Sequence, residues 1–117
     1  MYNKENIFYK ILKSELPAKV IYENEIALSF YDINPACKVH ALVITKGLYS
    51  NFDDFASNAS PKMVKDFFET VSRVANILGL SQTGYRIISN IGPNSGQEVE
   101  HFHMHILGGE PLKKTLL

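Results

Sequence analysis

The sequence predicts an α+β fold with five strands in one sheet, one short helix and one long helix. Three observations point to it: two β-rich runs separated by only two residues within 19–31, an apolar stripe at helical spacing over 61–78, and strict alternation of side chains over 101–106. At 117 residues the chain is long enough to bury one core. We therefore expect a single domain over residues 1–117.

The start of the chain predicts a short helix and then a hairpin. Asn6 is a suitable N-cap, and a helix that begins there is expected to end near Ser14, before Pro17. The β-rich runs 19–23 and 26–31 follow, and the two polar residues between them are typical of a hairpin turn.

A turn at 32–36 leads into the third strand. Asn34 precedes Pro35, which favours an extended break in the chain. The apolar run 39–45 then predicts a buried strand. The residues between this strand and Ser60 are expected to form a polar loop.

Ser60 and Pro61 predict the start of the long helix, because serine is a good N-cap and proline is tolerated at the first helical position. The helix is expected to continue to about Leu78, and Gly79 can end it in a left-handed conformation. Its apolar stripe predicts core packing, not a cofactor site. Residues 85–89 and the histidine-rich run near the C-terminus supply strands four and five.

Composition excludes several classes of function. Twelve Lys and Arg residues balance twelve Asp and Glu residues, so nothing indicates a nucleic-acid partner, and an anionic ligand must be held locally. The single cysteine, Cys37, suits a reducing compartment. No apolar run is long enough to cross a bilayer and no signal-peptide core is present. We therefore expect a cytoplasmic protein with no membrane partner.

Three of the four histidines occur at alternate positions, as His101, His103 and His105. On a strand they would share one face, backed by apolar residues on the other. Neutral imidazole near pH 7 is a nucleophile and a proton donor. The same spacing can also chelate zinc, which takes three protein ligands and a water in catalytic sites. The spacing alone leaves both interpretations open.

The loop over residues 90–98 precedes the histidines and contains Gly92 and Gly96. Glycines allow sharp turns and close approach to a ligand, and successive backbone N–H groups in such turns can bind phosphate oxygens. A loop of this composition is usually only a connection, but its position beside three histidines favours a binding role.

The run from His101 to Leu107 resembles the His-φ-His-φ-His-φ-φ signature of the histidine triad (HIT) nucleotide-binding proteins, and Gly108-Gly109 after it is similar to the bacterial-like Hint branch. Similar blocks occur in the same order along nearly the whole chain: Ile7-Phe8, Glu15-Leu16-Pro17-Ala18, His40-Ala41-Leu42-Val43-Ile44, Gly84-Tyr85-Arg86 and Gly96-Gln97-Glu98-Val99. The resemblance implies a homodimer in which two five-stranded antiparallel sheets join into a continuous ten-stranded sheet. It also implies a purine nucleotide beside each triad.

The resemblance assigns a role to each histidine. His103 corresponds to the nucleophile that attacks the α-phosphorus and forms a nucleotidyl-histidine. His101 and His40 resemble the pair that orients the triad by hydrogen bonds. His105 resembles a donor to the phosphoryl oxygens.

The resemblance also implies a nucleotide pocket. Asp32 is similar to the acceptor of the ribose hydroxyls, and Asn90 to a polar residue near the leaving group. Backbone N–H groups near Gln97 to Val99 would stabilise charge on the phosphoryl oxygens. The remaining positions are the loop residues Gly96, Gln97, Glu98 and Val99 and an apolar slot for the base formed by Ile7, Phe8, Leu16, Phe30 and Ile33.

Two departures from the family pattern matter. HIT proteins with a structural zinc carry two cysteines and a further histidine where this chain has Asn6, Tyr9 and Leu48, so no metal and no cofactor is expected. Glu98 stands where eukaryotic Hint proteins carry a small hydroxyl side chain. Because a carboxylate repels phosphate, we expect Glu98 to contribute its backbone and to turn its side chain away, toward a departing cationic amine.

The favoured function is a purine nucleoside phosphoramidase, a hydrolase of the adenosine 5′-monophosphoramidase type that cleaves P–N bonds in AMP-amine or GMP-amine substrates. The alternative is a nucleotide-binding regulatory protein whose hydrolysis is incidental, and a weaker third is a metal hydrolase. By resemblance, residues 84–88 and the helix around 63–74 are the candidate dimer interface.

Overall fold

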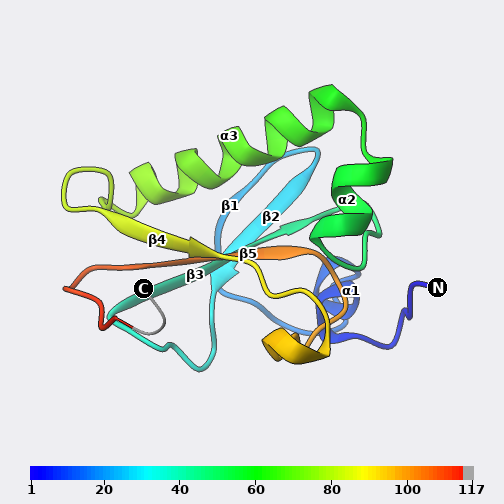
Figure 1. Ribbon diagram of the computed structural model, residues 1–117, viewed down its shortest axis with the longest axis horizontal. Coiled ribbons are helices and arrows are strands. Elements are labelled where there is room, and N and C mark those ends of the chain that lie inside the picture. The colour runs from blue at the N-terminus through cyan, green and yellow to red at the C-terminus, as the bar shows by residue number, and fades with distance from the viewer. Residues whose placement is uncertain (115–117) are drawn as a thin grey trace.

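The computed structural model describes residues 1–114 and confirms the α+β class with a five-stranded antiparallel sheet in the order β1-β2-β3-β5-β4 (Figure 1). The last three residues of the expected domain lie outside the described residues. The strands are β1 (Val20–Glu23), β2 (Ala27–Tyr31), β3 (Val39–Thr45), β4 (Tyr85–Ile88) and β5 (His103–Gly108).

The two predicted helices begin at the caps that the sequence indicated. The side chain of Asn6 accepts a hydrogen bond from the backbone N–H of Tyr9 at 2.8 Å at the start of α1 (Ile7–Leu12). The side chain of Ser60 accepts a hydrogen bond from the backbone N–H of Met63 at the start of α3 (Pro61–Ile77). Gly79, just after α3, has the left-handed φ of 74° that ends a helix without strain.

The prediction of a polar loop before Ser60 is wrong, because this segment contains a third helix, α2 (Phe52–Asn58). Asn51 caps it, and Phe55 is its one buried residue. The Phe55 ring packs against Phe67 and Phe102, at centroid distances of 5.3 and 4.8 Å. This tertiary packing stabilises a segment whose own sequence is mostly polar.

The sheet separates two apolar clusters. α3 covers one face, and α1 lies on the opposite side of the sheet (Figure 1). The larger cluster under α3 includes Met104 and Ile106, whereas the smaller one consists of Phe8 on α1 packed on Leu28, Phe30, Leu42 and Ile44. β5 therefore contributes core residues to one face and histidines to the other, as the alternation predicted.

The alternation extends two residues beyond the strand. β5 begins at His103, because the N–H of Phe102 is donated to the carbonyl of Tyr49 (2.7 Å) and not to a strand ladder. His101 precedes the strand, yet it is completely buried.

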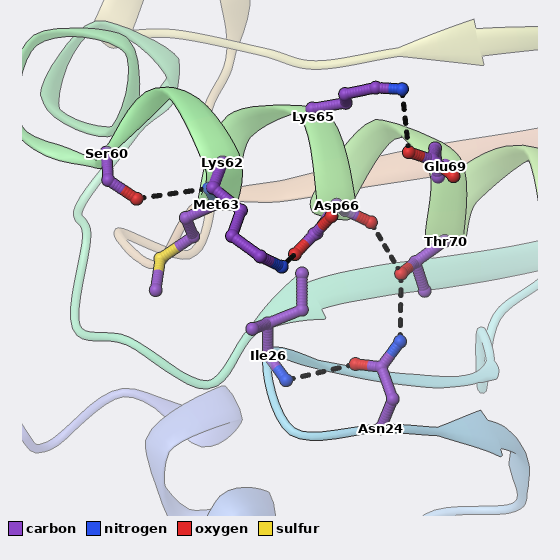
Figure 2. A network of polar contacts seen from close by, with 9 residues as sticks. All are labelled: Asn24, Ile26, Ser60, Lys62, Met63, Lys65, Asp66, Glu69 and Thr70. Carbon is purple, nitrogen blue, oxygen red and sulfur yellow. Dashed lines mark hydrogen bonds and ion pairs between the residues drawn. The ribbon is translucent and has the colours of Figure 1, made fainter.

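A polar network joins α3 to the turn between β1 and β2 (Figure 2). Asn24 Nδ2 donates to Thr70 Oγ1 at 2.9 Å, and Thr70 Oγ1 donates to the carbonyl of Asp66 one helical turn earlier. Asn24 Oδ1 accepts from the N–H groups of Ile26 and Ala27, both at 3.0 Å. One side chain thus closes the hairpin turn and attaches it to the long helix.

No helix among residues 1–114 combines the length and the apolar character that crossing a bilayer requires.

Candidate active site

The histidines gather on the face of the sheet that α1 covers. His103 pairs with Ile44 and His105 with Leu42, and paired residues of antiparallel strands point to the same side. His40 lies two residues before Leu42 on β3, so it shares that face. The rings of His103 and His105 are 5.1 Å apart, as are those of His105 and His40.

Backbone groups determine which nitrogen of His103 carries the proton. His103 Nδ1 lies 2.6 Å from the carbonyl oxygen of His101. Because a carbonyl only accepts, Nδ1 carries the hydrogen and donates it, which leaves the lone pair of the neutral ring on Nε2. The edge of Phe8 packs on this ring with centroids 4.9 Å apart. His103 is thus held as the tautomer whose Nε2 can act as a nucleophile.

The same argument determines which ring nitrogens of His40 and His105 carry hydrogen. The N–H of Ala36 donates to His40 Nδ1 at 3.0 Å, so the hydrogen of the neutral His40 ring is on Nε2. His40 Nε2 donates to His105 Nδ1 at 2.9 Å. His105 then carries its own hydrogen on Nε2, where it can be donated to a ligand.

His101 is anchored at both ring nitrogens. Its Nε2 donates to the carbonyl of Thr45 at 2.6 Å, and its Nδ1 accepts from the hydroxyl of Tyr2. Its side chain therefore does not bond to the other histidines, and its contribution to the triad is its backbone carbonyl under His103.

Burial keeps the cluster uncharged. Desolvation is the main cause that lowers the pKa of all four histidines, to about 4 for His101 and His105. The carboxylate of Asp32 opposes the shift for His40, His103 and His105, but it is the smaller effect. Near neutral pH the rings are therefore free bases, which a nucleophile requires.

Asp32 lies at the edge of the cluster with 19% of its side chain exposed. Its Oδ1 accepts from the N–H of Asn34 at 2.8 Å, and its Oδ2 is 3.4 Å from His40 Nε2. The carboxylate is held in place by this turn and retains acceptor capacity for a ligand.

The loop before the histidines is shaped by the side chain of Gln97. Gln97 Nε2 donates to the carbonyls of Ser50 and Val99, and its Oε1 accepts from the N–H of Gly92. Gly92 and Gly96 have φ of 76° and 77°, which favour glycine.

The sequence prediction gave Gln97 a free backbone N–H for phosphate, but this N–H is donated to the carbonyl of Gly92. Within residues 1–114, the backbone N–H groups of Glu98 and Val99 donate to no protein acceptor. Free donors in this loop thus lie one and two residues beyond Gln97.

The residues expected to form the apolar slot for the base lie in different environments. Phe8 and Phe30 are buried, with ring centroids 5.7 Å apart, and form a floor beside His103. Ile7 and Ile33 are 50% and 91% exposed, so they are not part of this buried floor. Leu16 instead lines a cavity at the C-terminal end of α1 that no histidine lines. The structure does not bring Leu16 to the histidines.

The polar residues expected near the leaving group lie around the loop. Asn90 lies two residues after the end of β4, and the neighbouring Ser89 Oγ donates to the carbonyl of His103 at 3.0 Å. The side chain of Glu98 is exposed.

One group of side chains has the spacing of a metal site. Single ligand atoms of Asp32, His40 and His105 lie within 4.8 Å of one another. However, the Ala36 N–H occupies Nδ1 of His40 and leaves the hydrogen on Nε2, so the neutral ring offers no lone pair to an ion between the three. This donor arrangement fits a proton relay better than a metal.

Four contributors to the site were missed from the sequence: Tyr2, the N–H of Ala36, the carbonyl of Thr45 and the side chain of Gln97. Tyr2 is far from His101 along the chain and has no motif around it, so no sequence signal marks it. Gln97 lies in the loop that the sequence singled out, but its role as a brace depends on Ser50, which only the fold brings close.

Comparisons with known proteins agree with this geometry. A family model described as the HIT domain matches residues 13–112. An uncharacterized HIT-like protein of Rickettsia prowazekii is 49% identical over 112 residues, covering 96% of this chain and 93% of the relative. The purine nucleoside phosphoramidase of Escherichia coli K12 is 34% identical over 113 residues, covering 97% and 94%.

The solved structures that this chain is similar to include HIT proteins as well. A histidine triad protein from Clostridium difficile has a TM-score of 0.88 at 36% identity, with 98% of this chain and 99% of that chain covered. A HIT family hydrolase from Clostridium thermocellum has a TM-score of 0.85 at 36% identity, with the same coverage. With the family model spanning most of the sequence and the histidines arranged as described, the chain belongs to the HIT, or histidine triad, family.

Proposed function

We propose that the protein is a hydrolase that cleaves the P–N bond of purine nucleoside phosphoramidates through a nucleotidyl-histidine. The observation that carries the proposal is the fixed tautomer of His103, whose Nδ1 is bound to the His101 carbonyl and whose Nε2 lone pair is free. A protein that only binds nucleotides has no need of a nucleophile held in this way. The name of the Escherichia coli relative supports the same substrate class.

Two displacements at phosphorus would complete the reaction. In the first, His103 Nε2 forms a bond to the α-phosphorus while the P–N bond to the amine breaks, and the amine takes up a proton as it leaves. In the second, water attacks the phosphorus, the bond to His103 breaks, and a nucleoside monophosphate is released. Division into two steps replaces one difficult attack by water.

In this proposal, hydrogen-bond donors on two sides stabilise the charge on the phosphoryl oxygens. His105 presents its Nε2–H, because its Nδ1 accepts from His40. The N–H groups of Glu98 and Val99 are free donors in the loop. Preorganised donors of this kind stabilise the transition state more than the ground state.

Ribose and base recognition follow from the remaining groups. Asp32 would accept hydrogen bonds from the ribose hydroxyls through its partly exposed carboxylate. The base would lie on the floor of Phe8 and Phe30, between the exposed side chains of Ile7 and Ile33. Leu16 belongs to the separate cavity and is left out of this pocket.

We also propose a homodimer with a continuous ten-stranded sheet. β4 is an edge strand, and edge strands are seldom left unpaired and flat. Tyr85 and Ile87 on this strand are 39% and 45% exposed, and Ile77 at the end of α3 is 51% exposed. Apolar side chains at an open edge support a contact between two copies there.

A substrate panel tests the activity. Purified protein is incubated with adenosine 5′-phosphoramidate, adenylylated lysine and a dinucleoside polyphosphate, with a chelator present, and products are followed by phosphorus NMR. We expect AMP from the two P–N substrates at a higher kcat/KM than from the polyphosphate. Tight AMP binding without turnover would instead indicate a nucleotide-binding regulatory protein, and activity restored only by zinc would indicate a metal hydrolase.

A further inference from the structure

Tyr2, before the first helix, is part of the buried histidine cluster. Its hydroxyl oxygen lies 2.5 Å from His101 Nδ1 and 2.8 Å from Asn6 Nδ2. The Tyr2 ring meets the His101 ring edge-on, with centroids 5.5 Å apart. Neither Tyr2 nor Asn6 lies within residues 13–112, the part of the chain matched by the family model.

The direction of each hydrogen bond is determined by its partners. Asn6 Oδ1 is occupied by the N–H of Tyr9, so Asn6 faces Tyr2 with its amide nitrogen, which only donates. His101 Nε2 donates to Thr45, so Nδ1 can only accept. The Tyr2 hydroxyl therefore accepts from Asn6 and donates to His101. Burial raises its pKa, which keeps the phenol protonated for this role.

These bonds continue to the nucleophile. With both nitrogens bound, the His101 ring is fixed, and its backbone carbonyl accepts the hydrogen of His103 Nδ1. We propose that Tyr2 is a positioning residue for the triad: its hydroxyl, oriented by Asn6, fixes His101, and the His101 carbonyl then holds His103 in the nucleophilic tautomer. The inference rests on the proposed hydrolase function for its kinetic consequence, but not for its structural one.

The main test is the Tyr2→Phe variant, which keeps the ring contacts and removes only the hydroxyl. Because His101 Nδ1 then becomes a buried acceptor without a donor, we expect kcat for adenosine 5′-phosphoramidate to fall about tenfold while AMP affinity changes by less than about twofold. Nitrogen-15 NMR of the histidine rings should show His103 shifting from a single tautomer toward a mixture. The matched control is Tyr9→Phe, because no hydrogen bond involves the Tyr9 hydroxyl within the described part of the chain, and it should behave as wild type.

A second variant, Asn6→Asp, tests the same bond from its other end. An aspartate at this position still caps α1 by accepting from the Tyr9 N–H. Its second oxygen, however, replaces the amide nitrogen that donated to the Tyr2 hydroxyl. This oxygen can only accept, so it competes with His101 for the hydrogen of that hydroxyl. We expect the same direction of change in kcat and in the histidine spectra as for Tyr2→Phe, and this variant decides the matter if Tyr2→Phe does not fold.

Three results would overturn the proposal: wild-type kcat and unchanged His103 spectra in both variants, an equal fall of kcat and AMP affinity, or an equal effect of Tyr9→Phe. If wild-type protein does not hydrolyse the phosphoramidate, the proposed function fails, whereas the ring spectra of Tyr2→Phe still test the positioning role.

Discussion

At the scale of single residues, the site works through backbone groups as much as through side chains. Carbonyls of His101 and Thr45 and the N–H of Ala36 determine which nitrogen of each ring carries a proton. Because these groups are fixed by the sheet and its flanking turns, the neutral histidines need no further reorganisation before they react.

Replacing the nucleophile tests the central assignment. His103→Ala or His103→Asn should reduce kcat to less than about one-hundredth of the wild-type value, because covalent catalysis is lost. AMP affinity, measured by calorimetry, should be largely retained, since the proposed base, ribose and phosphate contacts do not involve His103. A trapped phosphorus adduct on another residue, or a variant that keeps more activity than this, would contradict the assignment.

Ribose recognition is the second prediction at this scale. If Asp32 accepts from the ribose hydroxyls, dAMP should bind more weakly than AMP by about 1–3 kcal/mol, because part of the carboxylate loses its donor. Asp32→Asn should reduce the difference between the two ligands. Equal affinities of wild-type protein for AMP and dAMP would remove Asp32 from the site.

At the scale of helices and strands, the hairpin and the long helix depend on one half-buried amide, that of Asn24. Asn24→Ala removes the bonds to Ile26, Ala27 and Thr70, and we expect it to lower the free energy of unfolding by about 1–3 kcal/mol. Chemical denaturation measures the change. Thr70→Ser, which keeps the hydroxyl, is the control and should be much closer to wild type; an equally large loss there would assign the effect to packing instead.

The elements show what the sequence could predict and what it could not. α3 and β3 have strong local patterns and capping residues, so their positions could be predicted closely. α2 could not, because its stability comes from one phenylalanine packed among distant rings, although Asn51 and the acidic residues after it are a helix-start signal. Likewise, alternation predicted that the histidines share one face of a strand, but their tautomers depend on groups that only the fold brings to the rings.

At the scale of the whole molecule, the buried histidines make stability depend on pH. The pKa of His101 and of His105 is about 4 in the folded protein, against about 6.5 unfolded. Between these values the unfolded chain binds protons that the folded protein does not, so stability falls as pH decreases from about 6.5 to 4 and is unaffected by these groups above that range.

For the fully buried His101 the loss over the window is at most about 3 kcal/mol. Denaturation at a series of pH values should show this slope, and His101→Gln should make it shallower. A free energy of unfolding that stays constant from pH 6.5 to 4.5 would contradict the burial argument.

The open edge of the sheet predicts that two copies of the chain associate. Light scattering at micromolar concentration should give the mass of a dimer, and Ile87→Lys should shift the protein toward monomer, because it places a charge in an apolar contact. Ile33→Lys is the control for oligomeric state, because it also replaces an exposed isoleucine but lies between β2 and β3, neither of which pairs with β4. A monomeric wild-type protein would exclude the proposed interface.

The place of β5 in the strand order has a consequence for motion. β5 lies between β3 and β4, so its residues 105–108 are paired on both sides, whereas β1 and β4 are edges. Amide hydrogens along such a strand exchange with solvent through large-scale opening, more slowly than those at the edges. The amides of residues 105–108 should therefore be among the last in the protein to take up deuterium, and β5 should remain ordered until the domain as a whole unfolds.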